Sequence, residues 1–246
     1  MTARPPACVS CHVERPLDDR TWAAFSRLQE QRPGGFRIAA LVRPPDQEAG
    51  EDESRWLERA RAAAARGPFG LHTHWTSPSH ARPTGPDPAQ RVARELDWLH
   101  TRDLHPTLFA GGGWYLDEDV AETLAAAGVA DCTATAFRPP YLPPNAARLG
   151  AAEPTRLVLR SGARLLELPS THSLGMLARG VAGRLEGALV HVYFHDTDLL
   201  QPLRRAALVA ALTALGRLRA KPTDLDALRH EHAAAPETPF GEVYAR

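Results

Sequence analysis

Short apolar runs and amphipathic stretches alternate along this chain, and they predict strands and helices in turn. Residues 7–13 are mostly apolar, as in a buried strand, and residues 19–31 place Trp22, Phe25 and Leu28 at helical spacing. The same order then repeats, with Gly and Pro between the segments. The predicted strands are 7–13, 36–42, 69–74, 106–110, 129–135, 156–160, 164–168 and 189–194, and the predicted helices, with their caps, are 19–31, 51–66, 87–102, 117–128, 202–219 and 223–232.

This alternation favours a parallel sheet, because a helix between two strands carries the chain back to the same edge of the sheet. The runs 156–160 and 164–168 are separated by Ser161 and Gly162 and are compatible with a hairpin or with successive strands. No linker, shift in composition or internal repeat divides the chain. We therefore expect an α/β fold: one distorted (β/α) barrel of about seven parallel strands that forms a single domain over residues 1–246.

The composition excludes function classes more than it identifies one. With 43% hydrophobic and 24% charged residues, the 246-residue chain is ordinary for a globular protein. Its formal net charge is +0, so no basic surface indicates nucleic acid or an anionic membrane as a partner. No apolar run reaches the roughly 18 residues of a membrane span, and no secretory signal is recognised. We expect a cytoplasmic protein that acts on a small molecule or a carbohydrate, in an oligomeric state that the sequence leaves open.

Cys8 and Cys11 form a C-x-x-C sequence within the first predicted strand. Side chains three residues apart on a strand point to opposite faces, so the two thiols are not expected to form a redox pair or a zinc knuckle. We expect both to be buried as small apolar residues, and a total of three cysteines fits a reducing compartment.

Histidines are concentrated between residues 68 and 80, where the sequence is PFGLHTHWTSPSH. Residues two apart on a strand share a face, so His72 and His74 are expected to project together from the end of the third strand. His80 follows on a loop within reach of them. Neutral imidazoles at this spacing suit zinc, iron, nickel or copper, and the segment therefore predicts a transition-metal site.

Polar residues also follow the carboxyl ends of other predicted strands, and in a parallel barrel these ends meet on one face. His12 and Glu14 share a face at the end of the first strand, and His195 and Asp196 end the last one. Glu14 could ligate a metal or act as a general base, whereas His195, with its carboxylate neighbour, suits a general acid.

The deeper His191 is expected to be a hydrogen-bonded core histidine. Candidate substrate contacts are Gly113, Trp114, Tyr115 and His172.

Five segments together resemble the motifs of the polysaccharide deacetylases (the NodB-homology group, a carbohydrate esterase family) and follow in the same order. They are SCHVE (10–14), GLHTHWTSPSH (70–80), PTLFAGGGWY (106–115), LELPSTHS (166–173) and VYFHD (192–196). The resemblance implies a divergent member of that family: a metal-dependent hydrolase on a distorted β/α barrel that removes acyl groups from amino sugars. It also implies that His195 protonates the leaving amine.

Two departures from the family pattern leave the metal set open. His12 stands where the family has an aspartate, so either Glu14 is the base or His12 joins the ligands. The family's H-x-x-x-H spacing is absent here, so the second ligand is His74 or His80. The candidate ligands of a divalent transition metal, with zinc as the first choice, are therefore His12, His72, His74 and His80.

The leading hypothesis is a metal-dependent hydrolase of C–N (amide) bonds, deacetylase-like, that acts on an N-acylated sugar or a small amide through metal-activated water. Its catalytic roles fall to Glu14, His195 and Asp196. An HxH metal hydrolase of the PHP or amidohydrolase kind is an alternative, because LHTH is similar to its opening motif, although that motif belongs on a first strand. A non-catalytic relative that binds a carbohydrate or a metabolite in the same cleft is the third alternative.

Overall fold

Strands and helices alternate through most of the chain in the computed structural model, which describes residues 4–75, 82–83, 87–140, 142, 146–180 and 189–245. The strands are β1 (Pro6–Val13), β2 (Ala39–Val42), β3 (Phe69–Thr73), β4 (Leu108–Gly111), β5 (Ala130–Asp131), β6 (Arg148–Leu149), β7 (Thr155–Val158), β8 (Arg164–Glu167), β9 (His172–Ser173), β10 (Val190–His195), β11 (Lys221–Pro222), β12 (Glu237–Pro239) and β13 (Tyr244–Ala245). The helices are α1 (Asp19–Gln31), α2 (Glu53–Ala64), α3 (Pro88–His100), α4 (Glu118–Ala126), α5 (Leu174–Gly180), α6 (Pro202–Ala214) and α7 (Leu225–Glu231).

The expected parallel sheet is present, but its path is open. The strands are hydrogen-bonded in the order β12-β7-β8-β5-β4-β3-β2-β1-β10-β9, and every pair from β8 to β9 along this path is parallel. β7 and β8 are antiparallel, so this part of the chain forms the hairpin that was one of the two expected arrangements. In the described part of the chain the two ends of the path do not pair with each other, so the closed barrel is not confirmed.

The segment between β8 and β9 nevertheless brings two sides of the sheet near each other. Leu168 N donates to the backbone oxygen of Asp131 in β5 at 2.8 Å. Three residues later, Thr171 N donates to the backbone oxygen of His191 in β10 at 3.0 Å. The strands therefore curve around a common interior, although the ladder is interrupted along this segment.

Aspartate side chains fix the starts of several helices. At four helix starts the carboxylate accepts a hydrogen bond from the backbone N–H three residues later, which satisfies a donor of the first turn: Asp18, Asp52, Asp117 and Asp224. Asp87, expected to cap α3, has a left-handed φ of 56° and makes no such side-chain bond, so Pro88 alone marks that start. Within the described residues, no helix has the length and the apolar composition needed to cross a membrane.

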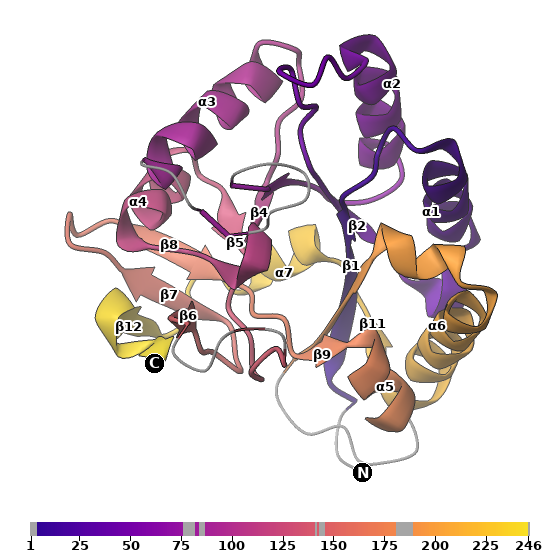
Figure 1. Cartoon of the computed structure of the whole chain (residues 1–246). Coiled ribbons are helices and arrows are strands. Elements are labelled where there is room, and N and C mark those ends of the chain that lie inside the picture. Colours follow the sequence, from indigo (N-terminus) through magenta and orange to yellow (C-terminus); the bar gives the residue numbers. More distant parts are fainter. Residues whose placement is uncertain are drawn as a thin grey trace.

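The sheet buries apolar side chains on both of its faces. Figure 1 shows helices α1 to α4 and α6 around the outside of the strands, and the main core lies between these layers. A smaller cluster on the inner face joins Cys8 and Leu41 to Leu225 and Leu228 of α7, the helix seen across the middle of Figure 1. Cys11 belongs to the main core, so the two thiols of the C-x-x-C sequence point to opposite faces of β1, as predicted, and both are buried.

Candidate metal and catalytic site

Three strand ends bring a carboxylate and four imidazoles together on the inner face of the sheet. His12 lies opposite His195 in the register of β1 and β10, and Glu14 follows His12 two residues later. β2 separates β1 from β3, which contains His72 and is followed directly by His74. Strands two apart in a flat sheet are separated by roughly 9.6 Å. The ring centroids of His12 and His72 are 4.5 Å apart, because the side chains converge over the curved inner face.

The carboxylate of Glu14 is at the centre of this group. Its Oε1 lies 3.4 Å from Nε2 of His74 and 3.9 Å from Nε2 of His72. Nε2 of His195 is 3.6 Å from the same oxygen. The ligand atoms of Glu14, His72 and His74 all lie within 4.8 Å of one another. A tetrahedral zinc ion with bonds of about 2.1 Å separates its ligand atoms by about 3.4 Å, so these three side chains are spaced as metal ligands would be.

The hydrogen bonding of His72 leaves its Nε2 available to bind a metal ion. Its Nδ1 donates to the backbone oxygen of Ala110 at 2.8 Å, so the neutral ring keeps its lone pair on Nε2. That Nε2 is buried without a hydrogen-bond partner in the described part of the chain, and so are both ring nitrogens of His74. Buried polar atoms are rarely left without partners. A metal ion would satisfy Nε2 of His72 and one ring nitrogen of His74, and the bond to Ala110 would orient the His72 ring.

Burial and neighbouring side chains shift the pKa values of Glu14, His72 and His12. Burial raises the pKa of Glu14, whereas hydrogen bonds and positive charge from protonated His72 and His74 would outweigh burial and hold this pKa well below its usual range. Burial lowers the pKa of His72. It lowers the pKa of His12 well below the usual value, and the neighbouring imidazoles of His72 and His195 act in the same direction. A carboxylate with neutral imidazoles is a donor set typical of zinc.

His12 lies next to Glu14, His72 and His74, and its ring packs against the aromatic side chains around them. Its ring centroid is 4.5 Å from that of His72, 5.4 Å from Tyr193 and 5.6 Å from Trp114. Its Nε2 is buried and has no hydrogen-bond partner among the described residues. His80 lies outside the described residues, so its role as a ligand stays a prediction.

His195 and Asp196 have different surroundings although they are adjacent in sequence. The side chain of His195 is 31% exposed, whereas Asp196 is fully buried. Asp196 Oδ2 accepts a hydrogen bond of 2.8 Å from the backbone N–H of Arg15, and burial raises the pKa of Asp196 to about 6. The carboxylate expected to orient His195 therefore binds the loop that follows Glu14, and Asp198 accepts the backbone N–H of His195.

Two predicted substrate contacts separate in the structure. Gly113 and Trp114 form a short turn directly after β4, and both have positive φ. Trp114 packs against Tyr193, with ring centroids 4.7 Å apart, and so lies beside the imidazoles. Tyr115 packs against Trp75 in the main core instead.

Two further histidines of this region are bonded within the fold. His172 lies on β9, is half-buried, and its Nδ1 bonds to the hydroxyl of Thr171 at 2.8 Å. His191 is the core histidine that the sequence indicated: Ser10 Oγ bonds to its Nε2 at 2.8 Å and its Nδ1 donates to the backbone oxygen of Leu168 at 3.2 Å. Burial lowers the pKa of His191 to about 4, so the ring is neutral near pH 7.

Tyr193 and Arg43 belong to the site and were not predicted from the sequence. Tyr193 precedes His195 by two residues, so the same spacing rule that paired His72 and His74 could have identified it. Arg43 directly follows β2, and its Nε donates to the backbone oxygen of Glu14 at 3.0 Å. No local pattern indicates that contact, because the two residues are 29 positions apart.

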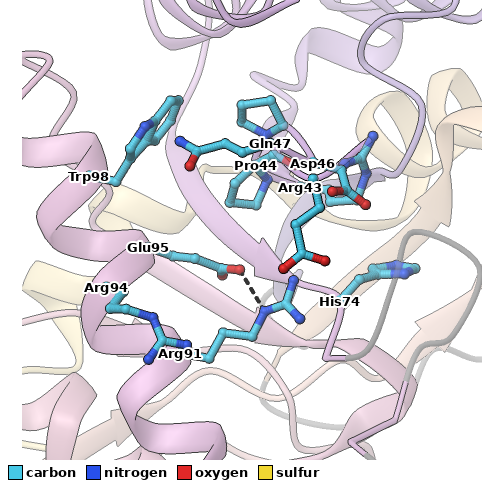
Figure 2. Close-up of a pocket in the computed structure, with 11 residues that line it drawn as sticks. Arg43, Pro44, Asp46, Gln47, His74, Arg91, Arg94, Glu95 and Trp98 are labelled. Atoms are coloured by element: carbon cyan, nitrogen blue, oxygen red, sulfur yellow. Dashed lines mark hydrogen bonds and ion pairs between the residues drawn. The ribbon is translucent and has the colours of Figure 1, made fainter. Parts of the chain in front are cut away.

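A cavity of about 490 Å³ opens beside His74. The loop after β2, residues 44–48, forms one wall, and α3 forms another with Arg91 and Glu95. Figure 2 shows His74 on the side of the cavity that faces away from the backbone of α3. Glu95 is fixed by Arg91 Nε at 2.9 Å and by the hydroxyl of Thr73 at 2.6 Å. A small polar molecule in this cavity would contact one of the candidate metal ligands.

A second cavity, of about 360 Å³, is lined by His195, Tyr193 and Asp198. Ser173 and Leu174, next to β9, form part of its wall. The candidate site therefore borders one cavity through His74 and another through His195.

Comparison with known proteins supports the fold. No family model matches the chain, and no curated protein matches it. A 4-alpha-glucanotransferase from Thermococcus litoralis is similar over 98% of this chain, with a TM-score of 0.55 and 9% identity, and the chain spans 40% of the length of that protein. A family 4 carbohydrate esterase from Streptomyces lividans, in complex with acetate, is similar over 100% of this chain and 98% of its own, with a TM-score of 0.46 and 11% identity. The first similarity supports an α/β fold with a mostly parallel sheet.

Proposed function

We propose that this chain is a metal-dependent hydrolase of C–N (amide) bonds, deacetylase-like, that acts on an N-acylated sugar or a small amide. The observation that carries the proposal is that one ligand atom each of Glu14, His72 and His74 lies within 4.8 Å of the others, with Glu14 Oε1 3.4 Å from His74 Nε2 and 3.9 Å from His72 Nε2. Both nitrogens are buried without a hydrogen-bond partner among the described residues. The resemblance of the sequence motifs to those of the polysaccharide deacetylases supports the same class of reaction.

Glu14, His72 and His74 would hold the metal, and zinc is the first choice for two imidazoles and a carboxylate. A bound divalent metal supplies a polarised acyl carbonyl and a water molecule of lowered pKa. Glu14 then has the role of a ligand instead of a general base, since its Oε1 lies 3.4 Å from His74 Nε2. His12 and His80 stay candidates for a further ligand; the buried Nε2 of His12 supports that role.

His195 is the residue that moves the proton in this proposal. It is 31% exposed, and its Nε2 lies 3.6 Å from Glu14 Oε1, within reach of a substrate held at the metal ligands. As water adds to the acyl carbon, His195 Nε2 takes a proton from it. The same nitrogen then gives this proton to the leaving amine as the C–N bond breaks, so the ring ends the cycle as it began.

The cavities beside His74 and His195 would receive parts of the substrate. We also propose that the whole chain forms one barrel-like catalytic domain. A cytoplasmic location is supported by the three cysteines, which are all free and buried: Cys8, Cys11 and Cys132.

Metal analysis of the purified protein tests this proposal. The wild-type protein should bind a stoichiometric amount of zinc, and His72→Ala or His74→Ala should lose it. His105→Ala, at a side chain that is 68% exposed, should keep it. His195→Ala should keep the metal and lose amide hydrolysis. A wild-type protein that binds no metal contradicts both hydrolase hypotheses and leaves a non-catalytic binding protein, and full turnover by His195→Ala contradicts the proton-transfer role.

A further inference from the structure

The peptide unit between Glu14 and Arg15 is bonded at both ends by charged side chains. Arg43 Nε donates to the Glu14 carbonyl oxygen at 3.0 Å, and the Arg15 N–H donates to Asp196 Oδ2 at 2.8 Å. Arg43 is 5% exposed and Asp196 is fully buried. Because a peptide unit is planar, bonds to its oxygen and to its nitrogen fix the orientation of the whole plane.

The guanidinium of Arg43 is itself held in place. Glu51 accepts hydrogen bonds from both of its terminal nitrogens at 2.9 Å, and the backbone oxygen of Pro44 accepts from one of them at 2.7 Å. The backbone of Arg43 is fixed too, since Trp56 Nε1 donates to its carbonyl oxygen at 2.7 Å and its own N–H donates to Val13 at 3.0 Å. A bidentate and mostly buried pair has a defined geometry that a surface ion pair lacks.

The two bonds reach Glu14 from opposite sides of β1. Arg43 follows β2 and Asp196 follows β10, and these are the two strands that flank β1 along the parallel path of the sheet. β1 itself ends at Val13, so Glu14 lies beyond the last residue of the strand, and its side chain is 27% exposed. The hydrogen bonds of the β1 strand do not reach Glu14. Arg43 and Asp196, which follow the neighbouring strands, hold this part of the chain instead.

We propose that Arg43 and Asp196 are positioning residues that hold the Glu14 carboxylate against the Nε2 atoms of His72 and His74 for metal binding. This inference rests on the metal site of the proposed function. It gives Asp196 a role toward the loop of Glu14 instead of toward the ring of His195.

A double-mutant cycle on zinc affinity tests this inference. Arg43→Lys keeps the charge but cannot form the bidentate pair, and it should weaken zinc binding roughly 10- to 100-fold, as the loss of outer-shell partners does at metal sites. In a Glu14→Ala background the same substitution should cost no further affinity, because Arg43 acts through Glu14. Asp196→Ala should behave like Arg43→Lys, and Asp196→Asn, which keeps an acceptor oxygen, should restore most of the affinity.

Arg160→Lys is the matched control, because Arg160 forms an exposed ion pair with Asp119. The Arg160→Lys variant should bind zinc with the affinity of the wild-type protein. Glu51→Gln loosens Arg43 without removing it, and it should weaken zinc binding even if Arg43→Lys fails to fold. Thermal unfolding of the metal-free variants shows which of them fold. The visible absorption of bound cobalt, which depends on coordination geometry, should change in Arg43→Lys and not in Arg160→Lys.

Unchanged zinc affinity in both Arg43→Lys and Glu51→Gln, with zinc bound by the wild-type protein, would overturn this inference and leave the proposed function intact. Equal losses in the wild-type and Glu14→Ala backgrounds would also overturn it, because the effect would not pass through Glu14. A wild-type protein that binds no zinc overturns both proposals.

Discussion

At the scale of the residue, the glycines at the end of β4 and directly after it show how available space and backbone angle determine the path of the chain next to the site. A Cβ added at Gly111 would lie 2.0 Å from the backbone oxygen of Tyr115, far inside the distance at which nonbonded atoms pack. Gly113 has a φ of 58°, a conformation that favours glycine. The glycine run thus allows the tight turn that places Trp114 beside His12.

We expect Gly111→Ala to destabilise the protein by about 1–3 kcal/mol, because the backbone must shift to admit the methyl group. Gly175→Ala is the control: it lies in α5, where an added Cβ would meet only the end of the Arg179 side chain at 3.7 Å, so its stability should be unchanged or slightly higher. Denaturant unfolding of both variants measures the difference. Equal stability of Gly111→Ala and the wild-type protein would contradict the close approach.

At the scale of the element, β5 and β8 bring two fully buried carboxyl groups together. Asp131 lies opposite Glu167 in the register of these strands. Thr133 Oγ1 donates to one oxygen of Asp131 at 2.6 Å, and Ala134 N donates to one oxygen of Glu167 at 3.2 Å. Burial raises the pKa of Glu167 well above its usual value and the Asp131 carboxyl raises it further, while burial also raises the pKa of Asp131. The pair therefore holds a proton that the unfolded chain releases.

This pair makes stability fall as the pH rises. The pKa of Glu167 is higher in the folded than in the unfolded protein. Above pH 4.5, its ordinary pKa, the unfolded chain releases the Glu167 proton while the folded protein keeps it, so the free energy of unfolding decreases as the pH rises. Glu167→Gln cannot ionise and keeps both hydrogen-bonding positions. We expect its unfolding midpoint to decline less with increasing pH than that of the wild-type protein. Parallel pH profiles for the two proteins would show that Glu167 carries no such proton.

The sequence predicted elements better than contacts. α1 has the predicted bounds because its apolar spacing is a local property of residues 19–31. β5 covers only Ala130–Asp131, whereas a strand over 129–135 was predicted, since an apolar pattern does not show where a strand leaves its ladder. The shared face of His72 and His74 could be predicted from a two-residue spacing, but the bond from Arg15 to Asp196 could not, because it joins positions 181 residues apart.

At the scale of the whole molecule, the metal ligands would tie β1 to β3 across the curved sheet. Glu14 follows β1, His72 belongs to β3 and His74 directly follows β3, so the complete ligand group exists only in the folded chain. A ligand that binds only the folded state stabilises it by an amount that grows with its concentration relative to Kd.

Zinc should therefore raise the thermal stability of the wild-type protein. At a hundredfold excess over Kd the gain is about 2.7 kcal/mol. For a domain of this size each kcal/mol shifts Tm by roughly 2–4 °C, so Tm should rise by roughly 5–11 °C. Calorimetry with zinc and with a chelator measures this shift, and His72→Ala should abolish it. The same shift in His72→Ala would place the stabilising ion elsewhere.

Crystallographic data collected at the zinc absorption edge test the central claim most directly. We predict an anomalous peak bonded to Glu14 Oε1 and to the Nε2 atoms of His72 and His74, at about 2.0–2.2 Å from each. Zinc-soaked or co-crystallised protein without a peak at these three atoms, or with peaks only at surface histidines such as His105, would contradict the proposed metal site.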